Sequence, residues 1–345
     1  MPSPLKYTTT SDGYSIAYLV RGTGTPLIEM PCILQGDIAK THELPANRSL
    51  YDPLAARFEL VLYDAFGTGN STRGIGPDHS MLDTQIDLEA VAGAADAASF
   101  VLYTHNFSCY TAMRFAGMYP ERLKALIMVN PSPLRGDVLM PSWRDFYLNA
   151  WPTFIEAFVS TGTPGGDQMR DVLSSSVTQA DFIAIANGGV GHAIEDVISA
   201  VTVPTLVLAS RNYLNPLYMP AAAEVASGVR NGRLLYFDGT KNADFMMTTD
   251  GTVPIGVQAI LDFLEELGVG EPAVTNGASL NSSGLSQREV EILKLIAAGK
   301  RNREIAQDLV ISDSTVAKHV SSILSKTDSS NRAEATTFAH THRLV

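Results

Sequence analysis

A helix expected after Ser312 carries the side chains best suited to binding a charged partner. One of its faces is small, polar and basic and has no acidic residue: Thr315, Ala317, Lys318, Ser321, Ser322 and Lys326. Such a face can enter a DNA major groove and place hydrogen-bond donors near base edges and phosphates. A second group, the basic Lys300, Arg301 and Arg303 with the polar Asn302 among them, precedes or opens another expected helix, whose free backbone N–H groups also favour phosphate. The pattern predicts a DNA-binding site, and the alternative is a small helical bundle with solvated charges.

Four short helices are expected to position these residues. Residues that can cap the four helix starts are Ser286 with Glu289, Asn302, Ser312, and Asn331 with Glu334. Gly299 follows the first helix, where a left-handed turn is usual. The third helix has one apolar stripe at helical period, formed by Val316, Val320, Ile323 and Leu324. The stripe predicts that this helix packs on the others and leaves its polar face free.

Residues 285–345 resemble the LuxR-type helix-turn-helix domain along their whole length, through LSQREVEILKLIAAGKRNREIAQDL, STVAKHVSSIL and NRAEA. The resemblance implies a four-helix domain that reads operator DNA as a homodimer, with RNA polymerase as a further partner. It assigns base reading to Ala317, Lys318 and Ser321, and places Thr315 and His319 near the DNA backbone. The family often has Lys at the position of Ala317, so a different preferred site is expected. It favours Gly and apolar residues in place of Thr327, Asp328 and Ser329, so we expect a looser turn there.

Charge is distributed unevenly along the 345 residues, which carry a net charge of −11. Residues 285–345 hold nine basic and seven acidic residues, leaving 16 basic and 29 acidic residues, a net charge of −13, for the remainder. A strongly acidic body repels DNA and confines the contact to the C-terminal segment. DNA affinity is therefore expected to depend on dimerisation.

The cysteines and the hydropathy exclude several classes of protein. Cys32 and Cys109 are too few for a disulfide framework or a zinc site, and the sequence predicts no metal or other cofactor. A signal peptide and an apolar run of transmembrane length are both missing, so a cytoplasmic protein with no membrane partner is expected.

Residues 1–267 alternate between strand and helix patterns. Strands are expected within 7–22, where two join at Asp12-Gly13, and at 26–30, 58–63, 100–104, 123–130, 205–209 and 233–237. Helices are expected at about 83–98, 109–119 and 253–267, which predicts a parallel sheet covered on both faces. Residues 133–200 hold aromatic residues at helical spacing and indicate a helical insert, where such residues more often form core than a ligand site. Residues 268–284, rich in Gly, Ser and Asn, predict a flexible linker.

Residues 5–267 resemble an α/β-hydrolase with a helical cap, through DAFGTGNS, FVLYTHNFSCYTAMRFAGMYPERLKALIMVNP and VPTLVLASRN. The implied fold class is an α/β sheet with a cap at about 133–200, followed by the small all-α domain. The family's nucleophile lies on a tight strand-to-helix turn, G-x-S-x-G. Here that turn reads Thr104 to Ser108, with Asn106 in the nucleophile's place. The family's acid and base positions fall on Asn212 and Asn242, and Pro31-Cys32 stands where His-Gly is usual.

Asparagine at all three positions predicts a loss of catalysis. An amide is neither a nucleophilic hydroxyl nor a general base near neutral pH, but it can donate and accept hydrogen bonds. One Asn at a strand end is ordinary in a turn, but turn formation does not readily explain Asn at all three catalytic positions of the family. We therefore expect no catalytic residues and a site for a small organic ligand lined by Asn106, Phe107, Cys32, Asn212, Asn242, Trp143 and Trp151.

Two alternatives to this ligand sensor remain. One is a hydrolase with displaced catalytic residues, for which Ser108 and His105 are available on the same turn. The other is a hydrolase fold used only as a scaffold for dimerisation. In the favoured interpretation the chain is a transcriptional regulator in which ligand binding alters the pose or dimerisation of the DNA-binding domain through residues 268–284.

Overall fold

A computed structural model describes residues 3–32, 36–74, 76, 84–132, 141–160, 166–188, 195–212, 218–238, 245–270, 285, 287–309, 313–342 and 344. The chain forms two compact units, Met1–Leu261 with Val269–Glu271, and Asp262–Gly268 with Pro272–Val345. From residue 271 onward, the expected linker lies outside the described residues. Among the residues described, no helix is long and apolar enough to cross a membrane.

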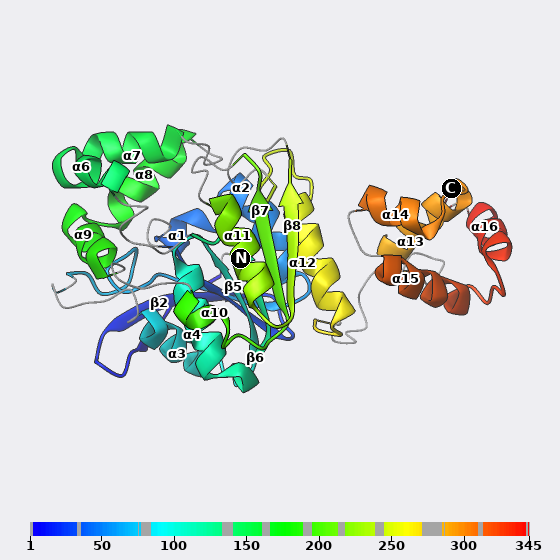
Figure 1. Ribbon diagram of the computed structural model, residues 1–345, viewed down its shortest axis with the longest axis horizontal. Coiled ribbons are helices and arrows are strands. Elements are labelled where there is room, and N and C mark those ends of the chain that lie inside the picture. The colour runs from blue at the N-terminus through cyan, green and yellow to red at the C-terminus, as the bar shows by residue number, and fades with distance from the viewer. Residues whose placement is uncertain are drawn as a thin grey trace. The chain divides into compact units, whose positions relative to one another are not determined.

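The larger unit is built on an eight-stranded sheet in the order β1-β2-β4-β3-β5-β6-β7-β8 (Figure 1). β1 (Lys6–Thr9) and β2 (Ser15–Arg21) are antiparallel, and β2 also pairs antiparallel with β4. The other strands are mutually parallel: β3 (Pro26–Met30), β4 (Glu59–Tyr63), β5 (Phe100–His105), β6 (Leu123–Val129), β7 (Thr205–Ser210) and β8 (Gly232–Phe237). The predicted α/β class and mostly parallel sheet are confirmed, because strands buried on both faces read as nearly continuous apolar runs.

Helices cover both faces of this sheet. α3 (Thr84–Ala94), α4 (Ser108–Met118) and α11 (Tyr218–Gly228) contribute side chains to one large core with the strands. Figure 1 shows α11 and α12 (Ile255–Glu266) on opposite sides of β7 and β8. α1 (Ile38–Thr41), α2 (Pro45–Ala55) and α11 were not among the predicted elements. α2 and α11 contain prolines, which usually break a helix. Pro45, however, lies in the first turn of α2, where its missing N–H costs nothing.

The predicted insert is helical, with α6 (Pro141–Asn149), α7 (Trp151–Ser160), α8 (Gly166–Ser176), α9 (Gln179–Gly188) and the short α10 (Glu195–Ile198). Helices α6 to α9 lie together as a cap (Figure 1). Trp151 stacks on Phe154 with ring centroids 5.3 Å apart, and Phe182 lies 5.0 Å from Phe154. Tyr147 meets Phe182 edge-on at 5.3 Å. These aromatics form the core of the cap, as the helical spacing favoured.

The smaller unit contains the four predicted helices, α13 (Gln287–Ala297), α14 (Asn302–Leu309), α15 (Asp313–Lys326) and α16 (Arg332–Thr341). Their shared core includes the predicted stripe of α15, with Val316 and Ile323 fully buried. Gly299 takes the expected left-handed conformation, φ 82°, and Lys300 N–H bonds the carbonyl of Leu295 at 3.1 Å, closing the helix end. The Asn331 cap is also confirmed, whereas Ser286 and Ser312 lie outside the described residues.

Candidate functional site

The turn between β5 and α4 keeps a strained geometry with Asn106 at its apex. Asn106 has φ 53°, a left-handed conformation that asparagine tolerates better than most residues. Its N–H donates to the carbonyl of Val129 at 3.0 Å, and its carbonyl accepts from Ser132 N at 3.3 Å. The side chain is partly exposed at the end of the parallel strands. The amide therefore sits where a tight strand-to-helix turn presents a side chain, as the sequence predicted.

Residues next to Asn106 tie this turn to the segment that follows β3. Phe107 is partly buried and packs against the main core. Ser108 donates its hydroxyl to the carbonyl of Pro31 at 2.6 Å. Pro31 precedes Cys32, which is 5% exposed. The structure thus brings three of the predicted ligand-site residues, Asn106, Phe107 and Cys32, to neighbouring segments at one edge of the sheet.

A buried polar network beside this turn was not predicted. β3 and β5 are parallel neighbours with Glu29 opposite Tyr103, and Glu29 Oε1 lies 3.2 Å from His105 Nε2. Cys32 and Tyr51 of α2 are polar neighbours of this pair. Glu29, His105 and Cys32 are each at most 6% exposed. The sequence signal was Glu29 itself, one acidic residue within the apolar strand PLIEM.

The protonation of His105 follows from these contacts. Burial by itself disfavours the imidazolium and lowers the pKa of His105. Hydrogen bonds and charges from Cys32 and Glu29 outweigh that effect and raise the pKa to about 9. At neutral pH the ring is therefore an imidazolium paired with a buried carboxylate.

The other predicted ligand-site residues are not assembled into a site by the described contacts. Asn212 is exposed after β7, and its backbone N–H donates to Ser210 Oγ at 3.1 Å. Asn242 and the side chain of Trp143 lie outside the described part of the structure. Trp151 belongs to the aromatic core of the cap.

Asn130, which the sequence reasoning missed, ends β6 in a left-handed conformation with φ 46°. Its Oδ1 accepts a hydrogen bond from Ser210 N at 2.9 Å, which joins the ends of β6 and β7. Like Asn106, it directly follows a buried strand, and that shared pattern in the sequence is the signal that could have found it.

The segment after β4 connects the sheet to the cap through a buried carboxylate. Asp64 is fully buried and accepts from Ile38 N at 2.8 Å, from Asn70 N at 2.7 Å and from Asn70 Nδ2 at 3.0 Å. Burial raises the pKa of the Asp64 carboxyl, and the hydrogen bonds from Asn70 and Ile38 oppose that shift. A side chain at Gly69 would place its Cβ 2.1 Å from Asp64 Oδ2, so only glycine fits there.

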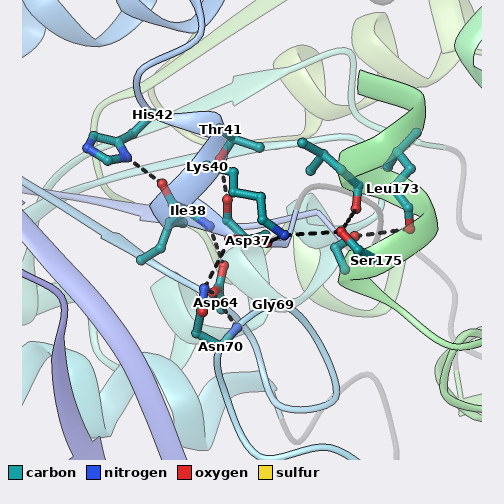
Figure 2. Close-up of polar contacts among 12 residues, drawn as sticks. Asp37, Ile38, Lys40, Thr41, His42, Asp64, Gly69, Asn70, Leu173 and Ser175 are labelled. Carbon is teal, nitrogen blue, oxygen red and sulfur yellow. Dashed lines mark hydrogen bonds and ion pairs between the residues drawn. The ribbon is translucent and has the colours of Figure 1, made fainter. Parts of the chain in front are cut away.

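Several contacts then hold α8 of the cap to this segment. Lys40 lies between the sheet and the cap, with Nζ 2.5 Å from Asp37 Oδ2 and 3.3 Å from Ser175 Oγ (Figure 2). Gly69 N–H donates to the carbonyl of Ser176 at 2.8 Å, and Arg73 donates to the carbonyl of Ser175 at 2.9 Å. The cap is therefore anchored to the sheet at the C-terminal end of α8.

In the smaller unit, the predicted DNA-binding residues of α15 fall into different surroundings. Ala317 and Ser321 are exposed, whereas the side chains of Thr315 and Lys318 lie outside the described part. His319 is 7% exposed, because it lies three residues after Val316 and four before Ile323, beside the buried stripe.

Ser322 and Lys326 are engaged by a carboxylate of α13. Lys326 Nζ lies 2.7 Å and 2.9 Å from the two oxygens of Glu289, and Ser322 Oγ donates to Oε1 at 2.6 Å. Glu289 is 3% exposed and was expected only as half of a capping box. These bonds fix the angle between α15 and α13, so a DNA contact by Ser322 or Lys326 remains a prediction.

The start of α14 differs from the expectation. Asn302 is the first residue of the helix rather than its cap, and its Oδ1 accepts from Arg332 at 2.6 Å. Arg332 also donates to the carbonyl of Lys300 at 2.7 Å, while Glu304 accepts from the N–H of Arg301 at 2.6 Å. The Asn302 cap was therefore wrong, because Glu304 reaches back to the helix start instead. Arg301 and Arg303 are exposed, as phosphate contacts require.

The turn after α15 is closed rather than loose. Asp328 has φ 50°, a left-handed conformation in which glycine is usually favoured. The N–H of Ser329 donates to the carbonyl of Leu324 at 2.9 Å. Thr327 Oγ1 donates to the carbonyl of Ile323 at 2.7 Å and contacts Ser329 Oγ at 2.8 Å. The expectation of a looser turn is wrong, because hydroxyl groups supply the bonds that close it.

Comparison with known proteins separates the same two parts. Residues 283–339 match the family described as bacterial regulatory proteins, luxR family, and residues 33–169 match the alpha/beta hydrolase fold. The transcriptional regulatory protein LiaR of Bacillus subtilis is 48% identical over 67 residues, which are 19% of this chain and 32% of LiaR. The chain thus spans about a third of that relative's length.

The larger unit has its own relatives. "Putative carbamate hydrolase RutD" of Azorhizobium caulinodans is 25% identical over 261 residues, covering 68% of this chain and 90% of RutD. A thermophilic esterase from Thermogutta terrifontis superposes with a TM-score of 0.62 at 19% identity, covering 77% of this chain and 99% of the esterase. At that identity the likeness shows the fold alone. The chain therefore joins a domain of the alpha/beta hydrolase fold to a C-terminal DNA-binding domain of the luxR family of bacterial regulatory proteins.

Proposed function

We propose that this chain is a transcriptional regulator that senses a small organic ligand through a catalytically inactive hydrolase-fold domain. The observation that carries the proposal is the turn at Asn106, which keeps its left-handed geometry, φ 53°, while presenting an amide. An amide at this place can bind a ligand by donating and accepting hydrogen bonds but cannot attack it as a hydroxyl would. The double-stranded DNA operator is bound by residues 285–345, and the working form is a homodimer.

The two alternatives have less support. A displaced serine nucleophile needs a base within hydrogen-bond reach, but the Ser108 hydroxyl donates to the carbonyl of Pro31. His105 is paired with Glu29 instead. A pure dimerisation scaffold would not require an amide on a strained turn, since strain of this kind clusters at functional positions.

Ligand binding is coupled to DNA through the linker at 268–284 in this proposal. A ligand shifts the balance between two arrangements of the domains only if its affinity differs between them. RNA polymerase is the partner through which a change at the operator would alter transcription.

Asn106→Leu tests the ligand site. A ligand found by screening compounds for a rise in melting temperature of the full chain should lose at least about tenfold in affinity, since a buried partner loses its hydrogen bonds. The matched control is Asn231→Leu, because Asn231 is exposed before β8, at the opposite edge of the sheet. Equal affinity in both variants would place the ligand away from the Asn106 turn.

Two variants of the luxR-family domain test its DNA contacts on an operator selected from random duplexes. Lys318→Ala should weaken binding and change the preference at one base pair, by about 1–3 kcal/mol.

Arg303→Ala should weaken binding to all sequences alike and flatten the salt dependence, because phosphate contacts carry no sequence information. Fluorescence anisotropy at several salt concentrations separates the two. An Arg303→Ala loss confined to the selected operator would contradict its phosphate role.

A further inference from the structure

The chain leaves the hydrolase-fold domain through a buried glycine. α12 ends at Glu266, and Gly268 and Gly270 follow it with φ 67° and 77°. A Cβ atom added at Gly270 would lie 2.1 Å from Cε1 and 2.2 Å from Cζ of Phe58, a residue that is 1% exposed. Both residues belong to the larger unit. The backbone of Gly270 therefore packs directly on the Phe58 ring, and the start of the expected linker is part of the folded domain.

Gly268 provides an internal contrast. Its N–H donates to the carbonyl of Glu265 at 3.0 Å, as is usual where a helix ends. It is exposed, and an added Cβ atom would meet nothing within 4 Å. The positive φ alone accounts for glycine at 268, whereas Gly270 is also required by the close approach to Phe58.

Phe58 lies at the end of α2 and is packed on two sides. Its N–H donates to the carbonyl of Leu54 at 2.9 Å, which ties it to the last turn of the helix. Gly22 packs against the same turn, since a Cβ atom there would lie 2.0 Å from the carbonyl oxygen of Ala55 and 2.4 Å from that of Phe58. Close-packed groups move between discrete arrangements rather than deform gradually. A shift of α2 must therefore also displace Gly270.

α2 connects this contact to the segment that follows β3, at the edge of the sheet where the Asn106 turn lies. α1 leads into α2, and the N–H of Leu44 between them donates to the carbonyl of Thr41 at 3.0 Å. Lys40 of α1 reaches Ser175 of the cap. α2 has 11 residues and is about 16 Å long. The two helices thus link the predicted ligand edge to the point where the chain leaves the domain.

We propose that Phe58 and Gly270 form a joint that transmits a shift of α1 and α2 to the segment leading to the DNA-binding domain. The proposal rests on the proposed function, because it names how ligand binding reaches the linker. A ligand that favours one position of α1 moves α2, and the Phe58 ring then displaces Gly270. Phe58 is a positioning residue that acts at a distance from the ligand.

Gly270→Ala tests the joint without a ligand, because the new Cβ atom forces the Phe58 ring aside. In the full chain it should speed amide hydrogen exchange at least about threefold in α2 and in α1, since coupling between two sites is reciprocal. Mass spectrometry of peptides measures the exchange. Gly268→Ala is the matched control, because it imposes the same strain of a positive φ in open space, and exchange in α1 and α2 should stay at the wild-type rate.

Phe58→Leu removes the two ring atoms nearest Gly270. Added to Gly270→Ala, it should return the exchange of α1 toward the wild-type rate, which general damage to the core would not allow. The affinity of the full chain for the selected operator, measured by fluorescence anisotropy, should change at least about twofold in Gly270→Ala and not in Gly268→Ala. The melting temperature of each variant checks its folding. If Gly270→Ala does not fold, Phe58→Leu alone decides, because it should speed exchange at residues 268–270 at least about threefold.

Equal exchange in Gly270→Ala and Gly268→Ala would overturn the joint. Faster exchange in α2 that does not extend to α1 would also overturn it, because the shift would not reach the ligand edge. Linked exchange with an unchanged operator affinity would overturn its regulatory role. The ligand site is tested separately by Asn106→Leu. A ligand response on DNA that persists without linked exchange therefore overturns the joint alone, and linked exchange with no ligand response counts against the proposed function alone.

Discussion

Asp64→Ala should lower the free energy of unfolding of the hydrolase-fold domain by about 3 kcal/mol. The carboxylate accepts hydrogen bonds from the N–H groups of Ile38 and Asn70 at 2.8 Å and 2.7 Å, in a place with no exposure to water. Alanine would leave both donors unpaired, at about 1–3 kcal/mol each. Burial raises the pKa of Asp64 because it removes water from around the charged carboxylate. Replacing this buried charge with alanine therefore offsets part of the cost.

Urea denaturation followed by tryptophan fluorescence measures this loss. Trp143 and Trp151 are the two tryptophans of the chain and both belong to the cap, so the signal also reports whether the cap detaches from the sheet. The matched control is Asp238→Ala, whose side chain is 79% exposed in an ion pair with Arg211. That change should cost less than about 1 kcal/mol. Equal midpoints for the two variants would show that the Asp64 contacts do not hold the segment together.

Local patterns were sufficient for much of the fold. Strands such as Glu59–Tyr63 and Leu123–Val129 are apolar runs bounded by turns, and such runs identify buried parallel strands without knowledge of their neighbours. The DNA-binding domain was placed for the same reason, because the Asn331 cap, the Gly299 turn and the stripe of α15 are all short-range features. The α2 helix was missed because Pro53 lies inside it, and proline usually signals a break.

Long-range pairings could not be predicted this way. Lys326 lies 37 residues from Glu289, and His105 lies 76 residues from Glu29, so spacing alone gives no reason to pair them. Both pairs depend on which helices or strands become neighbours. A buried acid in an apolar segment shows that a partner is needed without showing which. The same limit applied to the predicted ligand site, because the resemblance located the turn at Asn106 but not the Glu29–His105 pair beside it.

The hydrolase-fold domain should lose stability through His105 as the pH rises from about 6.5 to about 9. The pKa of His105 is raised from 6.5 to about 9 in the folded chain, where burial lowers it but Cys32 and Glu29 raise it more. A raised pKa means that the folded state binds the proton more tightly than the unfolded state. The stabilisation is therefore fully present below pH 6.5 and is lost as the pH passes through about 9. The whole effect amounts to about 3 kcal/mol.

Urea midpoints across this pH range for wild type and for His105→Gln isolate the contribution, because the other titrating groups cancel in the difference. The advantage of wild type should shrink by about 3 kcal/mol between pH 6 and pH 9.5. Glu29→Gln serves as the matched variant, since it removes the carboxylate at 3.2 Å but keeps the imidazole, and it should flatten the wild-type curve. Parallel curves for wild type and His105→Gln would mean that the imidazole holds no extra proton in the folded state. Such a result would mean that His105 and Glu29 do not form an ion pair in the folded chain, although Oε1 and Nε2 lie 3.2 Å apart.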